Sequence, residues 1–238
     1  MTPTDTTRPD PSTHLYGGTD PRDLPRYTYP EAARATGVPA TTIAAWVRGQ
    51  EYPRKHDRGF FRPVIDRPGE GRLSFLNLIE VHVLRGLRTK HAVKLDHVRR
   101  AAAIAEKKYK IDKLLLSEQL RFDAGGLFLQ RYGELLQLTP AEQYTLKDVL
   151  GACLDRVEWK NGLPRDFFPV ERLTPSGQKL ILLSPFISFG RPIIKRLGVT
   201  TRAIADRINA GEPEQSIIAD YGLDQAELKE ALAYESAA

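Results

Sequence analysis

The chain has 238 residues, of which 41% are hydrophobic and 27% charged, a composition typical of a globular protein with one or two domains. No run of about eighteen apolar residues occurs and the N-terminus lacks the apolar stretch of a signal peptide, so we expect neither membrane insertion nor export and predict a cytoplasmic protein. The formal net charge of +5 permits an anionic partner, and a single cysteine, Cys153, excludes an internal disulfide.

Residues 1–26 are rich in Pro, Thr and Asp and poor in large apolar side chains, so we predict that they form a disordered tail. Two short helices are predicted after this tail. Pro30 suits the first turn of a helix that Gly37 ends, and Pro39 begins a second helix that stops at Gly49. Two helices joined by a tight glycine-containing turn form the helix-turn-helix pattern.

The second of these helices is expected to have a packed side and an outward side. Its apolar spacing places Ile43, Trp46 and Val47 on the packed side. The outward residues are Thr41, Thr42 and Arg48. A helix that enters the major groove of double-stranded DNA reads base edges with residues near its N-terminus, so Thr41 and Thr42 are candidate base contacts.

Residues 60–65 and 72–75 form apolar runs on either side of a Pro and Gly cluster, DRPGEG, which predicts the turn of a β-hairpin. A hairpin that directly follows a helix-turn-helix is a wing. Basic residues crowd the end of the second helix and the start of the wing, where they are positioned for phosphates or the minor groove. These candidate DNA contacts are Arg48, Arg54, Lys55, Arg58 and Arg62.

The part of the chain after the wing mixes helical and strand patterns. Residues 77–90 and 94–110 carry apolar residues at helical spacing, and the second of these segments is strongly basic. The patterns that follow are a hairpin at 125–138, a helix at 139–154 and strands at 155–160 and 179–184. The predicted fold class is therefore α+β.

The C-terminal segment contains three helical runs separated by AGEP and YGLD. Thr200 or Thr201 is predicted to cap the first run and Asp224 the third, while Gly222 suits the turn of a second helix-turn-helix. Acidic residues predominate here, and because carboxylates repel phosphates, the third helix is better suited to contact protein. The candidate protein contacts are Gln225, Glu227 and Glu230. Basic residues just before this helix leave a secondary DNA contact open: Lys195, Arg196, Arg202 and Arg207.

Recognisable catalytic and metal-binding motifs do not occur in the sequence. The five histidines lie outside HExxH and CxxC contexts, and no phosphate-binding glycine motif or GxSxG string is present. We therefore expect no enzyme activity, no catalytic residue, no bound metal and no cofactor.

Two segments resemble known families. The N-terminal module through GLRTK resembles the winged helix of MerR-type regulators, which pairs an Ala-rich helix and a Gly-Val turn with a second helix and a basic wing. The chain departs from that pattern at Ala44 and Ala45, where the family has an arginine and an aromatic residue. The C-terminal segment resembles the DUF433 family in its Gly-Arg-Pro, Ala-Gly-Glu-Pro and Tyr-Gly-Leu elements.

A chain that joins these two ends resembles the VapB45-type antitoxins. The resemblance implies a transcriptional repressor that autoregulates its operon and neutralises a PIN-type ribonuclease toxin. The alternatives are a MerR-like regulator that senses a small ligand in its middle region without a toxin, and an adaptor that binds only protein. A homodimer is expected, because one helix and one wing touch few base pairs and specific sites usually comprise two half-sites.

We predict four regions. They are a disordered tail at 1–26, a MerR-like winged helix-turn-helix with the following helices at 27–110, an α+β middle region at 111–177 and a DUF433-like helical domain at 178–238.

Overall fold

The structure is a computed structural model, and it describes residues 17–53, 58–66, 69, 71–91, 116, 151, 153–169 and 178–237. Over these residues, helices and short antiparallel strand pairs form the α+β fold expected from the sequence. The helices predicted at 94–110 and in most of 139–154, and the hairpin predicted at 125–138, lie outside the described residues. No helix in the described part is long and apolar enough to cross a membrane.

The two predicted N-terminal helices are confirmed as α1 (Tyr29–Thr36) and α2 (Ala40–Arg48). Thr28 and Glu31 form a reciprocal capping box at the start of α1, in which each side chain accepts a backbone N–H of the other residue. Gly37 ends α1 in the left-handed region at φ 70°, a conformation that glycine adopts without steric cost. The short turn between the helices therefore follows from local sequence rules.

The predicted packed side of α2 is also confirmed, because Ile43, Trp46 and Val47 are all buried. Their neighbours in the same core include residues of α3 (Phe75–His91). This helix is buried around nearly its whole circumference from Phe75 to Leu87, which makes it the central element of the described part. We call α1, α2, the hairpin described next and α3 the N-terminal module.

The hairpin after α2 is present, but its predicted strands and turn are wrong. It consists of β1 (Gln50–Pro53) and β2 (Arg58–Phe61), paired antiparallel. Phe60 and Phe61 thus pair with the polar strand before them rather than with residues 72–75. Leu73 instead forms a bridge with Tyr27, whose N–H and C=O both bond to it, and is fully buried there. Leu73 thus pairs with a residue that precedes α1, and a local sequence pattern does not reveal a pairing over such a distance.

The N-terminal module begins earlier than the predicted end of the tail at residue 26. Arg22 accepts a hydrogen bond through its carbonyl from the N–H of Leu76, at 3.2 Å, and Arg26 N–H donates to Leu73 O at 2.8 Å. Residues 1–16 lie outside the described part.

Short strand pairs connect the N-terminal module with the C-terminal helices. They are β3 (Val157–Lys160) with β4 (Leu163–Phe167), and β5 (Ile181–Leu182) with β6 (Ile193–Ile194). A bridge between Phe167 and Leu183 links the first pair to the second. The predicted strands at 155–160 and 179–184 are therefore confirmed in part, the second as a two-residue strand.

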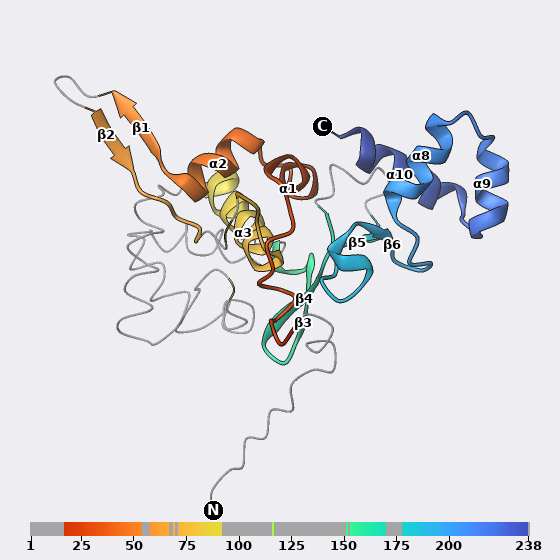
Figure 1. Ribbon diagram of the computed structural model, residues 1–238, viewed down its shortest axis with the longest axis horizontal. Coiled ribbons are helices and arrows are strands. Elements are labelled where there is room, and N and C mark those ends of the chain that lie inside the picture. The colour runs from red at the N-terminus through yellow and green to blue at the C-terminus, as the bar shows by residue number, and fades with distance from the viewer. Residues whose placement is uncertain are drawn as a thin grey trace, which may run out of the picture.

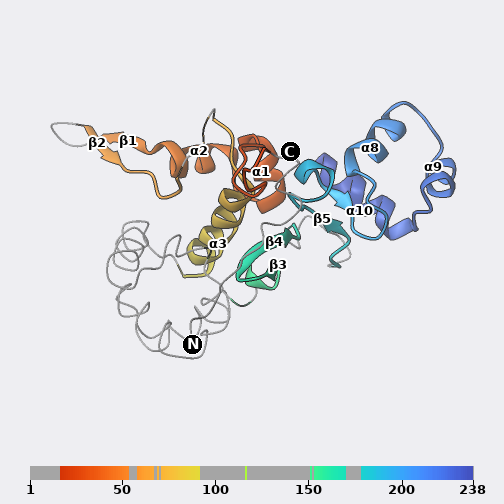
Figure 2. The ribbon, with the colours of Figure 1, turned by 60° about the horizontal axis from the view of Figure 1, so that its bottom comes forward.

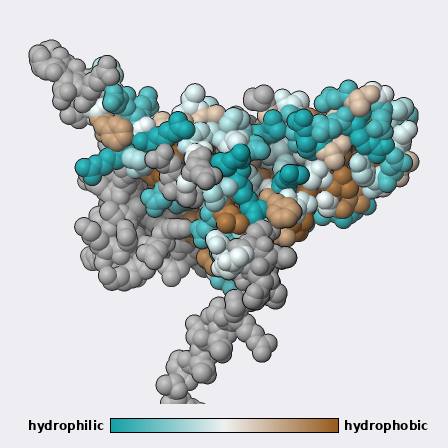
Figure 3. Space-filling view, in the orientation of Figure 1, coloured by the Kyte–Doolittle hydropathy of each residue, from teal (hydrophilic) through white to brown (hydrophobic). Residues whose placement is uncertain are grey.

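The three predicted C-terminal helices are confirmed as α8 (Thr201–Asn209), α9 (Glu214–Tyr221) and α10 (Gln225–Ser236). Thr200 caps α8 and Asp224 caps α10, and Gly222 ends α9 at φ 67°. We call β5, β6 and these helices the C-terminal module. It lies on the far side of α1 from the projecting β1–β2 hairpin in both views (Figures 1 and 2), and much of its surface is hydrophilic (Figure 3).

His82 on α3 is a buried titratable group in the core. Its ring lies edge-on to Phe167 with centroids 4.9 Å apart, and its Nε2 is 2.9 Å from the carbonyl oxygen of Cys153. Burial, reinforced by the charges of Arg85 and Arg156, lowers the pKa of His82 from 6.5 to about 4. The ring is therefore neutral in the folded protein at pH 7.

Protonation of His82 should contribute to unfolding at low pH. Its pKa is lower in the folded than in the unfolded chain, so its stabilising effect is present above pH 6.5 and is lost as the pH falls toward 4. We expect this group alone to reduce the free energy of unfolding by about 3 kcal/mol at pH 4. Urea titrations of the wild type and of His82→Gln should converge as the pH falls, and parallel curves would contradict the assignment.

Candidate DNA-binding surface and the cleft between the modules

The outward side of α2 has small side chains between a threonine and an arginine. Thr41 and Arg48 are exposed, and Ala44 and Ala45 between them are half-buried. Thr42 is half-buried at the edge of this side. Pro39 occupies the cap position and α2 has no side-chain cap, so neither threonine performs that structural role.

Arg48 and Arg62 lie at the same end of α2. The guanidinium carbon of Arg48 is 5.0 Å from the ring centroid of Tyr29, within cation–π range. The chain leaving β2 returns to this end, because Val64 N–H donates to Trp46 O at 2.8 Å. Arg62 is exposed just after β2 and Arg58 begins that strand. The other two predicted basic residues, Arg54 and Lys55, lie outside the described residues.

The hairpin also displays aromatic side chains from the apolar run at residues 60–65. Phe60 is 55% exposed and Phe61 41% exposed. Phe61 stacks on Tyr52 across the strand pair with ring centroids 4.1 Å apart. The sequence analysis did not include these aromatic residues in the candidate surface, although their position between Arg58 and Arg62 was a signal for an exposed strand.

The predicted acidic contact side of α10 needs correction. Gln225 is exposed, but Glu227 and Glu230 are buried. Glu227 completes the capping box of α10 with Asp224, and its carboxylate accepts from Arg196 Nε at 3.0 Å and Nη2 at 2.7 Å. Glu227 therefore serves the fold, and both carboxylates are buried rather than displayed on the surface of α10.

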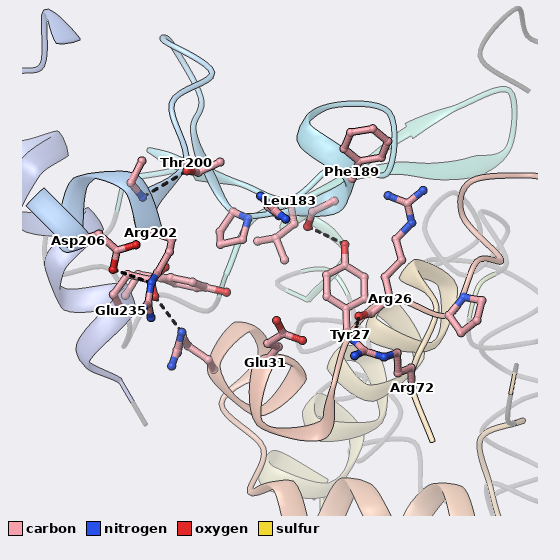
Figure 4. Close-up of a pocket in the computed structure, with 17 residues that line it drawn as sticks. Arg26, Tyr27, Glu31, Arg72, Leu183, Phe189, Thr200, Arg202, Asp206 and Glu235 are labelled. Carbon is pink, nitrogen blue, oxygen red and sulfur yellow. Dashed lines mark hydrogen bonds and ion pairs between the residues drawn. The ribbon is translucent and has the colours of Figure 1, made fainter. Parts of the chain in front are cut away.

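A cleft of about 860 Å³ separates the two modules. Figure 4 shows residues from both sides around it, with Tyr27 between the two walls. The Tyr27 hydroxyl donates to the carbonyl of Gly190, at 2.9 Å. Burial raises the pKa of Tyr27 and of Tyr234, which also lines the cleft, well above the usual range, so both phenols stay protonated.

Two further contacts hold the modules together. Arg34 of α1 forms an ion pair with Glu235 of α10, with Nη1 and Oε2 2.9 Å apart, and donates through Nε to Ala237 O at 3.1 Å. The other carboxylate oxygen of Glu235 accepts from Thr201 Oγ1 at 2.6 Å. Glu235 is therefore shared by helices of both modules.

Gly190 leaves no room for a side chain beside Tyr27. It has φ 78°, and a Cβ at this position would lie 2.5 Å from the Tyr27 hydroxyl oxygen. The glycine of the Gly-Arg-Pro element is thus needed both for its backbone conformation and for the close approach of Tyr27.

The C-terminal module and the chain as a whole are both similar to known proteins. Residues 181–234, most of the C-terminal module, match the model of a family described as a protein of unknown function, DUF433. The chain as a whole is similar to a protein of Mycobacterium tuberculosis named "Putative antitoxin VapB45", with 25% identity over 228 residues that cover 88% of this chain and 93% of that protein. These two matches confirm the predicted resemblances to VapB45-type antitoxins and to the DUF433 family.

The fold has a counterpart in a solved structure. The crystal structure of Rv2018 from Mycobacterium tuberculosis superposes with a TM-score of 0.65 and covers 88% of this chain and 98% of that one. At 21% sequence identity, this similarity supports the arrangement of elements and no more than that.

The contact between Tyr27 and Gly190 can be tested with a double-mutant cycle. Tyr27→Phe should cost about 1–2 kcal/mol of unfolding free energy, because it leaves the buried carbonyl of Gly190 without its donor. Gly190→Ala should cost more, since it adds a steric clash to a left-handed backbone. In the double variant the missing hydroxyl makes room for the methyl group, so chemical denaturation should show a loss smaller than the sum. Additive losses would show that the two residues act independently.

Proposed function

We propose that the chain is the antitoxin of a type II toxin–antitoxin system. In this role it binds and neutralises a PIN-type ribonuclease toxin and represses its own operon by binding double-stranded DNA. The observation that carries the proposal is the similarity to a protein named as an antitoxin over 88% of this chain and 93% of that protein. The family resemblance supplies the toxin class. Such a protein acts by binding, so the proposal assigns it no catalytic residue.

The proposed DNA-binding surface is the outward side of α2 together with the β1–β2 hairpin. The small side chains of Ala44 and Ala45 permit close approach to the floor of a major groove, and exposed Thr41 is available to a base edge, with Thr42 at its border. Arg48 and Arg62 supply positive charge where helix and hairpin meet. Arg54 and Lys55 follow β1 in the sequence and Arg58 begins β2, and we include all three in the proposed surface. A homodimer would present two such surfaces to the half-sites of one operator.

The proposed toxin-binding surface is the exposed acidic side of the C-terminal module. With Glu227 and Glu230 buried, the acidic residues exposed there include Glu214, Asp220 and Asp224. Asp220 also pairs with Arg207 at 2.6 Å and Asp224 caps α10, so Glu214 is the carboxylate of this set without an ion pair to an arginine or lysine among the described residues. Gln225 adjoins them, and its Nε2 lies 3.4 Å from Glu214 Oε2. Acidic side chains suit a basic surface on a nuclease that itself binds RNA.

A MerR-like regulator without a toxin is the second candidate, and the cleft between the modules is the observation that favours it. This candidate places a small ligand, rather than a protein, in control of DNA binding. The gene neighbourhood separates the two, because only the first requires an adjacent toxin gene.

Binding to a duplex from upstream of the coding sequence should depend steeply on salt. Each lysine or arginine that contacts a phosphate releases counterions, so replacing Arg54, Lys55 and Arg58 by Ala should flatten the plot of log affinity against log salt by about one unit per lost contact. The control removes three exposed positive charges elsewhere, at Lys160, Arg165 and Lys229. If both triple variants change the slope equally, the hairpin is not the DNA-binding element.

Co-expression with the adjacent PIN-type gene should restore growth that the toxin alone arrests. Glu214→Lys with Gln225→Lys cancels the net negative charge of the proposed toxin-binding surface, and we expect toxin affinity to fall by about tenfold or more. Gln50→Lys with Glu51→Lys makes the same chemical change on the hairpin and should leave toxin binding intact. Pull-down and growth assays report both results, and loss of toxin binding only in the hairpin variant would reverse our assignment of the two surfaces.

A further inference from the structure

The two phenylalanines of β2 have different surroundings. Because they are adjacent on one strand, their side chains point to opposite faces of the hairpin. Phe61 stacks on Tyr52, whereas Phe60 is 55% exposed and no aromatic or charged side chain among the described residues engages its ring. Figure 3 shows an apolar patch on the hairpin, bordered by hydrophilic side chains. Phe61 therefore stabilises the hairpin, while most of the Phe60 ring faces solvent.

Phe60 nevertheless has a defined position against the end of α2. Gly49 ends this helix at φ 80°, and a Cβ at Gly49 would overlap both Cζ of Phe60 and the carbonyl oxygen of Phe61. Only glycine allows the backbone to approach the ring so closely. A large ring that is exposed and already positioned loses little conformational entropy when a partner covers it, which favours binding.

The charged residues around this ring are mainly basic. Arg48 directly precedes Gly49 and Arg62 follows two residues after Phe60, and both are exposed. Glu51 lies opposite Phe60 in the strand pair and is the acidic residue of β1 and β2 in the described part of the chain. Two arginines against one carboxylate leave this end of the hairpin net positive. An apolar ring with a positive border suits DNA, whose surface combines phosphates with apolar sugars and base edges.

We propose that Phe60 enters the minor groove of DNA and wedges against a base step. This inference rests on the proposed function, in which α2 occupies a major groove. The hairpin projects beyond the end of α2 (Figures 1 and 2), so it extends toward the minor groove that flanks this major groove. Phenylalanine is among the side chains that insert between base steps from the minor groove, where partial unstacking bends the duplex.

Such a wedge would give the protein a sequence preference without a hydrogen bond to a base. Pyrimidine–purine steps such as TA and CA unstack more easily than other steps, so the wedge favours them. Phe60 would therefore add specificity outside the bases that Thr41 and Thr42 can reach from α2.

The contribution of Phe60 to affinity can be separated from that of the basic residues. Phe60→Ala should weaken binding to the upstream duplex by about tenfold at every salt concentration. The slope of log affinity against log salt should stay unchanged, because an uncharged ring releases no counterions. Phe60→Trp keeps an aromatic ring and should retain most of the affinity. As a matched control, Phe189→Ala removes an exposed phenylalanine of the C-terminal module and should leave DNA binding unchanged.

Energy transfer between dyes at the two ends of the same duplex tests the wedge itself. At saturating protein, the wild type should bring the ends closer together than Phe60→Ala does, because only the wild type bends the duplex at the wedged step. Unfolding temperature and sedimentation establish that the variants remain folded with unchanged mass. Absence of DNA binding by the wild type would contradict the proposed function and the wedge together. If the wild type binds and Phe60→Ala bends the duplex equally, at whatever affinity, only the wedge is overturned.

Discussion

Tyr27 contacts both modules and fixes the N-terminal module against the C-terminal module. Its backbone pairs with Leu73 and closes the N-terminal module, while its hydroxyl binds the carbonyl of Gly190 in the C-terminal module. One residue therefore couples the strand pairing within one module to the backbone of the other. Tyr27 and Gly190 both line the cleft between the modules, so this contact gives the Gly-Arg-Pro element a structural role in the module that contains it.

Features governed by neighbouring residues were predictable from the sequence. The ends of α1, α9 and α10 follow from Gly37, Gly222 and Asp224, because capping depends on residues within one turn. The packed side of α2 followed from its periodicity. Part of the candidate DNA-binding surface was predictable for the same reason. Arg48 ends α2 and Arg62 directly follows β2, so their positions follow from where these elements end.

Features that depend on distant residues were not predictable. The strand partner of Phe60 and Phe61 depended on Leu73 being taken by Tyr27, 46 residues before it. Glu227 is buried together with two hydrogen bonds from Arg196, which lies outside α10. A helical projection of α10 alone does not show these hydrogen bonds. The cleft belongs to this second group as well, because its walls come from opposite ends of the chain.

The ion pair between Arg34 and Glu235 has a consequence for how the protein is made. The two residues are 201 positions apart, so a ribosome synthesises α1 long before the carboxylate that it pairs with exists. During that interval α1 has no partner for Arg34, and the surfaces of the N-terminal module that later enclose the cleft are open to solvent. Contacts of such long sequence separation form slowly. Docking of the C-terminal module is therefore a late event, and a nascent chain has a period in which proteases and chaperones reach surfaces that the finished protein conceals.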